Sequence, residues 1–185
     1  PNGVGKSTFF KTILGFLKPV SGSIFIDERD IQTIPRKELA KISGYVPQIH
    51  GNPFPYSVRD IVLMGRASHL RLFAEPGRSD YRRCDEILEK LDILYLKDKL
   101  YSEISGGEQQ MTLIARALVQ EPEFIMMDEP TSNLDYGNQI QVLKRVVELK
   151  NSGKGVVMIT HSPDQAFLCA DEAVLFFRDG SVVSG

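Results

Sequence analysis

The chain has 185 residues, 42% of them hydrophobic, and a formal net charge of −2. This length can bury a sizeable core in one or at most two compact units. The charge provides no basic surface of the kind that nucleic-acid binding usually requires, so no nucleic-acid partner is expected. No apolar run approaches the roughly 18 residues needed to cross a bilayer, so any membrane role needs another subunit to span it.

The chain opens with Pro1-Asn2-Gly3-Val4-Gly5-Lys6-Ser7-Thr8, which matches the phosphate-binding pattern G-x-x-x-x-G-K-[ST] from its second position onward. Gly3 and Gly5 can take positive φ, so backbone N–H groups can turn toward phosphate oxygens, and Lys6 adds a positive charge. A helix expected from about Ser7 directs its N-terminal N–H groups at the same anion, and the Ser7 hydroxyl can ligate Mg²⁺. The alternative is a glycine-rich turn that happens to contain a lysine. An apolar stripe in the following helix favours the phosphate loop: Phe9, Phe10, Ile13, Leu14 and Leu17.

Short strands and helices follow. Residues 23–27 alternate like a strand, a short helix is expected from about Pro35, and residues 42–46 form the next strand candidate. That strand ends at Gln48 and opens into a loop at residues 50–56.

The middle of the chain, residues 57–100, is rich in helical patterns and lacks strand signals. Ser57 with Asp60 predicts the N-cap of a first helix, which carries Val58, Ile61, Val62 and Met64. Residues 65–77 are irregular. Ser79 is predicted to cap a second helix, whose inward face holds Cys84, Ile87, Leu88 and Leu91.

The last part of the chain returns to alternating elements. Residues 104–109 carry two glycines and lead into a helix with Met111, Ile114, Ala115 and Leu118 inward, which makes a second potential anion site. Two apolar runs, 124–127 and 156–159, predict buried parallel strands. Between them a helix with Ile140, Leu143 and Val147 inward stops at Gly153. Ser162 to Gln165 predicts a capping box for a helix to about Ala170, and Asp179-Gly180 predicts the turn of a β-hairpin within 173–183.

This order of elements predicts an α/β fold with a mainly parallel sheet and right-handed crossovers. Residues 1–56 and 101–185 would form the core, and residues 57–100 an inserted helical subdomain. Cys84 and Cys169 lie far apart within apolar helical patterns, which predicts buried, reduced thiols and a cytoplasmic setting.

Several polar residues follow the strands directly, at the sheet edge where parallel sheets bind ligands. Asp128 is placed to hold Mg²⁺ together with Ser7, and Glu129 to act as a general base. His161 can donate a hydrogen bond to a terminal phosphate, and the Gln48 amide can touch metal or water. For the acids taken alone, the alternative is a cluster at a helix N-terminus. Structural roles are expected for His50 and His69, and a solvated face for Arg66, Arg71, Arg78, Arg82 and Arg83.

The order and spacing of these motifs resemble the nucleotide-binding domain of ABC transporters. The motifs are the phosphate loop, Gln48, the stretches 104–108, 124–129 and 132–135, and His161. The resemblance covers essentially the whole chain and implies a phosphate-loop NTPase core that hydrolyses ATP with Mg²⁺. It implies that two such domains meet head to tail, with each ATP between the phosphate loop of one and the Ser105-Gly106-Gly107-Glu108 signature of the other. Glu129 then matches the catalytic base, Asp128 the metal-site aspartate, His161 the switch histidine and Asp135 the loop that couples the two sites. Gln48 matches the residue that links nucleotide to the membrane subunit.

The same resemblance implies transmembrane permease partners, contacted by the loop at 50–56, and a place at the cytoplasmic face of the membrane. Residues 58–66 and 105–118 look most like importers of iron-siderophore, haem or cobalamin type, in which Glu108 is familiar where glutamine is commonest. The pattern's first glycine, the preceding strand, the adenine-stacking aromatic residue and a part beyond Gly185 are absent, which predicts a fragment of a longer protein. Two alternatives stay open: a soluble ABC-type ATPase that acts on ribosomes or DNA, and a regulatory module without hydrolysis.

Overall fold

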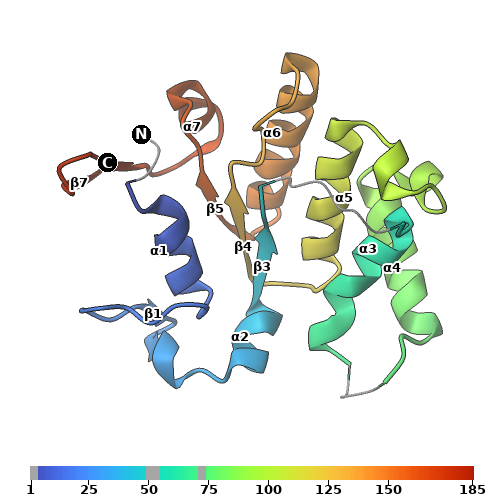
Figure 1. The fold of residues 1–185 in the computed structure, drawn as a ribbon, viewed down its shortest axis with the longest axis horizontal. Coiled ribbons are helices and arrows are strands. Elements are labelled where there is room, and N and C mark those ends of the chain that lie inside the picture. Colours follow the sequence, from blue (N-terminus) through green and yellow to red (C-terminus); the bar gives the residue numbers. More distant parts are fainter. Residues whose placement is uncertain (1–3, 49–54, 71–73) are drawn as a thin grey trace.

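The computed structural model describes residues 4–48, 55–70 and 74–185. At its centre, three parallel strands are ordered β3 (Ser43–Val46), β4 (Phe124–Asp128) and β5 (Gly155–Ile159). The register places Tyr45 opposite Met126, and Met126 opposite Val157. Figure 1 shows α1 on one side of this sheet, and α5 and α6 on the other.

The central strand β4 is buried on both faces. Met126 packs with Phe10 and Leu14 of α1, whereas Ile125 and Met127 belong to the larger core on the opposite face. Burial on both sides explains why this strand is a continuous apolar run, and the prediction for residues 124–127 is confirmed.

The prediction of full burial is wrong for β5. Ile159 is buried, but Val157 is 44% exposed. Within the described residues β5 pairs only with β4, so it is an edge strand of this sheet. An apolar run therefore does not show how many neighbours a strand has.

Helix α1 (Lys6–Ile13) begins where the phosphate-binding pattern predicts. Its stripe is only partly buried, because Phe10 and Leu14 face the sheet while Phe9 and Leu17 are exposed. The strand expected at 23–27 shortens to β1 (Phe25–Ile26), which pairs antiparallel with β2 (Arg29–Asp30).

This small hairpin was not predicted, because its turn residues, Asp27 and Glu28, take positive φ without glycine or asparagine. The 3₁₀-helix η1 (Ile31–Thr33) and α2 (Arg36–Ile42) then lead into β3. The helix expected near Pro35 is thus confirmed.

The described part of residues 57–100 is helical: α3 (Val58–Leu63), η2 (Met64–Ser68), α4 (Arg78–Lys90) and η3 (Leu94–Leu96). Ser57 and Asp60 form the predicted cap as a full capping box. The cap predicted at Ser79 is wrong. Gly77 is the N-cap of α4, since its N–H donates to the Asp80 carboxylate at 2.9 Å.

The inward face of α4 is as predicted, with Cys84, Ile87, Leu88 and Leu91 all buried. Cys84 and Cys169 are buried thiols, as expected. The division of the chain into a core and an inserted helical subdomain stays a prediction.

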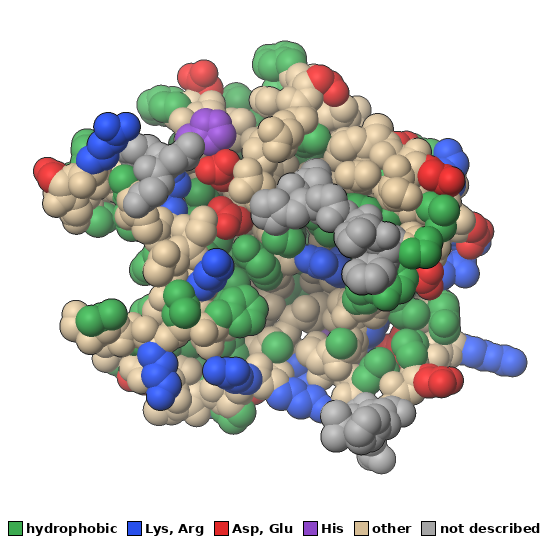
Figure 2. Space-filling model, in the orientation of Figure 1, with side chains coloured by type: hydrophobic (Ala, Val, Ile, Leu, Met, Phe, Trp, Pro, Cys, Tyr) green, Lys and Arg blue, Asp and Glu red, His purple; other side chains and the backbone are tan. Residues whose placement is uncertain are grey.

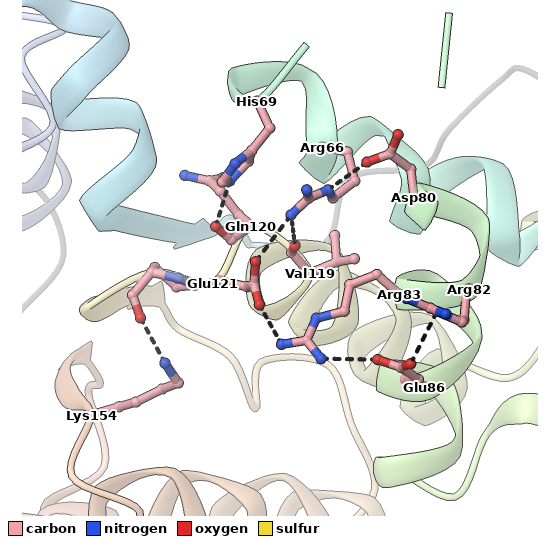
Figure 3. Close-up of polar contacts among 11 residues, drawn as sticks. Arg66, His69, Asp80, Arg82, Arg83, Glu86, Val119, Gln120, Glu121 and Lys154 are labelled. Carbon is pink, nitrogen blue, oxygen red and sulfur yellow. Dashed lines mark hydrogen bonds and ion pairs between the residues drawn. The ribbon is translucent and has the colours of Figure 1, made fainter. Parts of the chain in front are cut away.

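Polar contacts join η2 and α4 to the turn between α5 and β4 (Figure 3). Arg66 donates to Asp80 at 2.9 Å and to the Val119 carbonyl at 3.0 Å, and it contacts Glu121 at 3.4 Å. Arg83 pairs with the same Glu121. The prediction that these arginines form a solvated face is wrong for Arg66, whose side chain is only 14% exposed.

Two further polar contacts hold the turn between α5 and β4, at the carbonyls of Gln120 and Pro122. His69 Nε2 lies 2.9 Å from the Gln120 carbonyl, in keeping with the structural role expected for that histidine. Lys154 donates to the Pro122 carbonyl at 2.7 Å (Figure 3). His50 and Arg71 fall outside the described residues.

The last elements are η4 (Tyr101–Glu103), α5 (Gly106–Leu118), α6 (Tyr136–Asn151), α7 (Pro163–Cys169), β6 (Val174–Phe176) and β7 (Val182–Ser184). The inward residues predicted for α5 are all buried. In α6, Leu143 is buried as predicted, but Ile140 and Val147 are half-buried, and the face is completed by Val142, Val146 and Leu149.

The C-terminal hairpin is confirmed, with β6 and β7 antiparallel across the Asp179-Gly180 turn. Proline at the start of α7 is also confirmed. Among the described helices, none is both long and apolar enough to cross a membrane.

Candidate functional site

The N-terminus of α1 differs from those of the other described α-helices. Gly5 precedes it with φ 96°, no side chain caps it, and its first turn contains no acidic residue. In contrast, α2, α3, α4, α5 and α7 each carry an acid in the first turn, and α6 is capped by the Asp135 side chain. N–H groups that point out of a helix N-terminus and the positive end of the helix dipole make such an end suited to an external anion. Asn2 and Gly3, predicted to line the same loop, fall outside the described residues.

Ser7 and Asp128 face each other across the gap between α1 and the end of β4. Ser7 Oγ lies 3.4 Å from Asp128 Oδ1, and Asp128 is only 8% exposed. Oxygen ligands lie about 2.1 Å from a bound Mg²⁺, so the Ser7 and Asp128 oxygens, which are 3.4 Å apart, can bind the same ion. Hydroxyl and carboxylate oxygens are hard donors, and Mg²⁺ commonly takes one or two protein ligands with the rest from phosphate and water. The residues therefore fit the expected metal.

Glu129 lies next to this pair, at the centre of a second group of contacts. Its Oε2 is 3.5 Å from Gln48 Nε2 and 3.4 Å from His161 Nδ1. The three residues follow β4, β3 and β5, so the structure brings together side chains that the sequence placed at three strand ends. Figure 2 shows a histidine beside acidic side chains on this side of the molecule. We call Lys6, Ser7, Gln48, Asp128, Glu129 and His161 the phosphate edge.

The backbone of Glu129 is unusual. It has φ 47°, and its N–H donates to the Ile159 carbonyl at 3.0 Å. A non-glycine residue at positive φ is strained, and such residues gather at functional sites where the surrounding structure fixes them. Nothing in the local sequence signals this conformation.

A buried polar network supports the two turns that carry Glu129 and His161, and sequence reasoning missed it. Thr131 Oγ1 and Thr160 Oγ1 donate to Gln165 Oε1 at 2.9 and 2.8 Å. The capping box predicted for Ser162 and Gln165 is therefore wrong, because the Gln165 side chain binds the two threonines and the Ser162 side chain caps no N–H group of α7. The sequence did offer a signal for this network, since Thr131 follows the Asp128-Glu129 pair closely and Thr160 directly precedes His161.

The signature turn, which we define as Ser105, Gly106, Gly107 and Glu108, begins α5. Ser105 is its N-cap, and its N–H and Oγ–H donate to Glu108 Oε2 at 2.7 and 2.8 Å. The Glu108 N–H donates back to Ser105 Oγ at 3.3 Å. These bonds to Ser105 are the main reason why the pKa of Glu108 lies below its usual value.

Gly107 lets α5 approach the start of α6 closely. A Cβ at Gly107 would lie 2.2 Å from Asn138 Oδ1, whereas a Cβ at Gly106 would meet Leu134 at an ordinary 3.5 Å. Asp135 is the N-cap of α6 and accepts from the Asn138 N–H at 3.1 Å. Asp135 is therefore joined to the signature turn through Asn138.

The signature turn and the phosphate edge do not meet within the described chain. α1 and α5 lie on opposite sides of the sheet (Figure 1), and the described hydrogen bonds of the Ser105 and Glu108 side chains stay within the signature turn and Tyr95. The structure thus collects five of the predicted site residues at one edge: Ser7, Gln48, Asp128, Glu129 and His161. The signature turn and Asp135 form a separate cluster around Asn138, and the roles predicted for both clusters stay predictions.

Residues 1–132 match the family model described as ABC transporter. The chain belongs to this family. An ABC transporter ATP-binding protein of Haemophilus influenzae is 42% identical over 174 residues, which are 94% of this chain and 66% of that protein. The molybdate import ATP-binding protein MolC of the same organism is 39% identical, over 94% of this chain and 64% of its own length.

A hemin import ATP-binding protein of Rhizobium meliloti is 36% identical, over 95% of this chain and 68% of its length. Among solved structures, a metal-chelate type ABC transporter in an inward-facing conformation has a TM-score of 0.89 and 36% identity, covering all of this chain and 69% of the other. The chain thus has the α/β fold of the phosphate-loop ATPases in this family. It spans about two thirds of the length of the curated relatives it matches.

Proposed function

We propose that this chain is the ATP-hydrolysing part of a membrane ABC transporter. The observation that carries the proposal is the phosphate edge. There, an uncapped helix N-terminus, a Ser7–Asp128 oxygen pair and the carboxylate of Glu129 lie side by side. Phosphoryl transfer to water needs a phosphate cradle, a divalent metal and a group that orients or deprotonates the water.

Each residue then has one role in hydrolysis. The N–H groups at the start of α1, with Gly5, Lys6 and Thr8, hold the β- and γ-phosphates of ATP, and Asn2, Gly3 and Val4 complete the loop. Ser7 and Asp128 hold Mg²⁺, which neutralises charge on the phosphates when bound. Glu129 accepts a proton from the attacking water, and His161 donates a hydrogen bond to the γ-phosphate. Gln48, which contacts Glu129 and Ser132, touches the metal or the water.

The signature turn acts on a second copy of the chain. Because it lies apart from the phosphate edge within one molecule, any phosphate that it binds must come from another molecule. A head-to-tail dimer supplies the γ-phosphate of the ATP that is seated on the partner copy. Ser105, Gly106 and Gly107 would bind that phosphate, and Asp135 would couple the two sites.

The remaining partners are transmembrane permease subunits, which place the protein at the cytoplasmic face of a membrane as a peripheral subunit. The cargo class is a metal chelate of iron-siderophore, haem or cobalamin type. Its support is the hemin import relative and the metal-chelate type structure. A relative that imports molybdate indicates that cargo varies among similar ATP-binding chains.

The test is Glu129→Gln in the complete gene product. We expect ATP turnover to fall by about 10²–10⁴ while ATP binding survives, because the base is lost and the phosphate contacts are not. Glu123→Gln, an exposed acid just before the same strand, is the control and should leave turnover unchanged. Near wild-type turnover in Glu129→Gln, or no Mg²⁺-dependent hydrolysis in the wild type, would contradict the proposal.

A further inference from the structure

The Glu108 carboxylate is fully engaged on both oxygens. Oε2 accepts from the Ser105 N–H and Oγ–H, and Oε1 accepts from the Tyr95 hydroxyl at 3.0 Å. A capping box requires only the first set of bonds. The third donor comes from η3, thirteen residues earlier in the chain, so the Tyr95 bond is not explained by helix capping.

Tyr95 is held in place by its neighbour. Leu96 in the same turn is completely buried, whereas Tyr95 itself is 67% exposed. The tyrosine therefore projects from an anchored turn toward the start of α5. Burial and the bond to Glu108 raise the pKa of Tyr95, so its hydroxyl stays protonated and keeps donating at neutral pH.

The Ser105 hydroxyl has only one proton to donate. In the described structure this proton is directed at Glu108 Oε2, and the hydroxyl oxygen already accepts from the Glu108 N–H. A γ-phosphate oxygen only accepts hydrogen bonds, so Ser105 must turn its O–H away from Glu108 to bind it. The ionised Glu108 would also repel the phosphate.

We infer that Glu108 holds the Ser105 hydroxyl until the partner's ATP arrives and that Tyr95 weakens this hold, so that the pair sets the ATP concentration at which two copies engage. The inference rests on the proposed function, in which Ser105 binds that γ-phosphate. Ser105 is the residue in contact with the nucleotide, and Glu108 acts through it. Tyr95 acts through Glu108, because its hydrogen bond to Oε1 draws negative charge away from the oxygen that accepts from Ser105.

The first test is Glu108→Gln, made in a Glu129→Gln background so that bound ATP persists. Glutamine preserves the capping box, but the Ser105 bond loses its charge assistance, which makes such bonds roughly twice as strong. The ATP concentration that gives half-maximal association, followed by sedimentation velocity with Mg²⁺, should fall about threefold to tenfold. Glu103→Gln, an exposed acid close by, is the matched control.

The second test is Tyr95→Phe in the same background. Without the tyrosine donor, the Glu108 charge is concentrated on the bonds to Ser105, and half-maximal association should need about twofold to threefold more ATP. In a protein that already carries Glu108→Gln, Tyr95→Phe should change the ATP concentration for half-maximal association by less. Tyr81→Phe on α4 serves as the control, since Tyr81 is also exposed and its hydroxyl makes no hydrogen bond within the described part of the chain.

Opposite shifts for the two variants, with unchanged controls, support the pair, because mere loss of structure would move both variants the same way. Shifts in one direction, or no shift, overturn the inference while ATP-dependent association of the parent protein keeps the proposed function standing. Absence of ATP-dependent association in the parent itself overturns the proposed function, and the inference with it.

Discussion

The phosphate edge and the signature turn are both polar, yet they differ in how tightly their side chains are bonded. The side-chain contacts of the first are long: 3.4 Å for Ser7 to Asp128, 3.5 Å for Gln48 to Glu129 and 3.4 Å for His161 to Glu129. At the signature turn, Ser105 donates to Glu108 at 2.7 and 2.8 Å.

The difference in these hydrogen-bond distances indicates two kinds of binding site. At the phosphate edge, side chains converge without strong bonds to one another, so a metal ion and phosphates can take over their lone pairs at little cost. At the signature turn the side chains satisfy each other, so a ligand must compete with bonds that already exist. The first cluster is ready for its ligand, and the second must exchange a bond to receive one.

The largest expected effect concerns the packing of the signature turn. Gly107→Ala should lower the free energy of unfolding by about 1–3 kcal/mol, because its Cβ would collide with Asn138. Gly106→Ala has room for the same methyl group and is the matched control. Both are measured by urea denaturation. Equal stability for the two variants would mean that the α5–α6 contact is looser than described.

Much of both clusters could be predicted from the sequence, because local rules govern their backbones. The glycines before Lys6, the glycine-bearing helix start at 104–109, and acids at the end of an apolar run are readable within a few residues. β4 was predictable for the same reason, since burial on both faces leaves an uninterrupted apolar run.

The features that escaped prediction depend on contacts between distant residues. Gln165 serves Thr131 rather than its own helix, and Arg66 is buried against Val119 and Glu121 instead of facing solvent. The Tyr95–Glu108 bond belongs to the same class. Local sequence also could not decide whether Gly77 or Ser79 caps α4, because both residues closely precede Asp80. Only the three-dimensional structure shows that the Asp80 carboxylate accepts from the Gly77 N–H.

A smaller effect concerns the charge at the signature turn. Since the pKa of Glu108 is lowered in the fold, its ionised form stabilises the protein at pH values above its unfolded pKa of about 4.3, and this contribution is lost as pH falls through the folded pKa. Wild type should be more stable than Glu108→Gln by about 0.3–1 kcal/mol at pH 7, the usual range for an acid at a helix N-terminus.

That difference should shrink as pH falls below about 4.3 and through the lower folded pKa, as seen by urea denaturation at a series of pH values. Glu103→Gln, at an exposed acid close by, is the matched control. A gap between wild type and Glu108→Gln that stays constant with pH would mean that the carboxylate charge does not hold the turn.

The central claim is that one ATP site takes its phosphate edge from one copy and its signature turn from another. Two variants of the complete gene product, Lys6→Ala and Gly106→Asp, both in a Glu129→Gln background, test it by sedimentation velocity with ATP and Mg²⁺. Neither variant alone can build an intact site, but a mixed pair contains one. We predict that each variant alone stays monomeric and that their mixture associates; a mixture that behaves like the separate variants would contradict the claim.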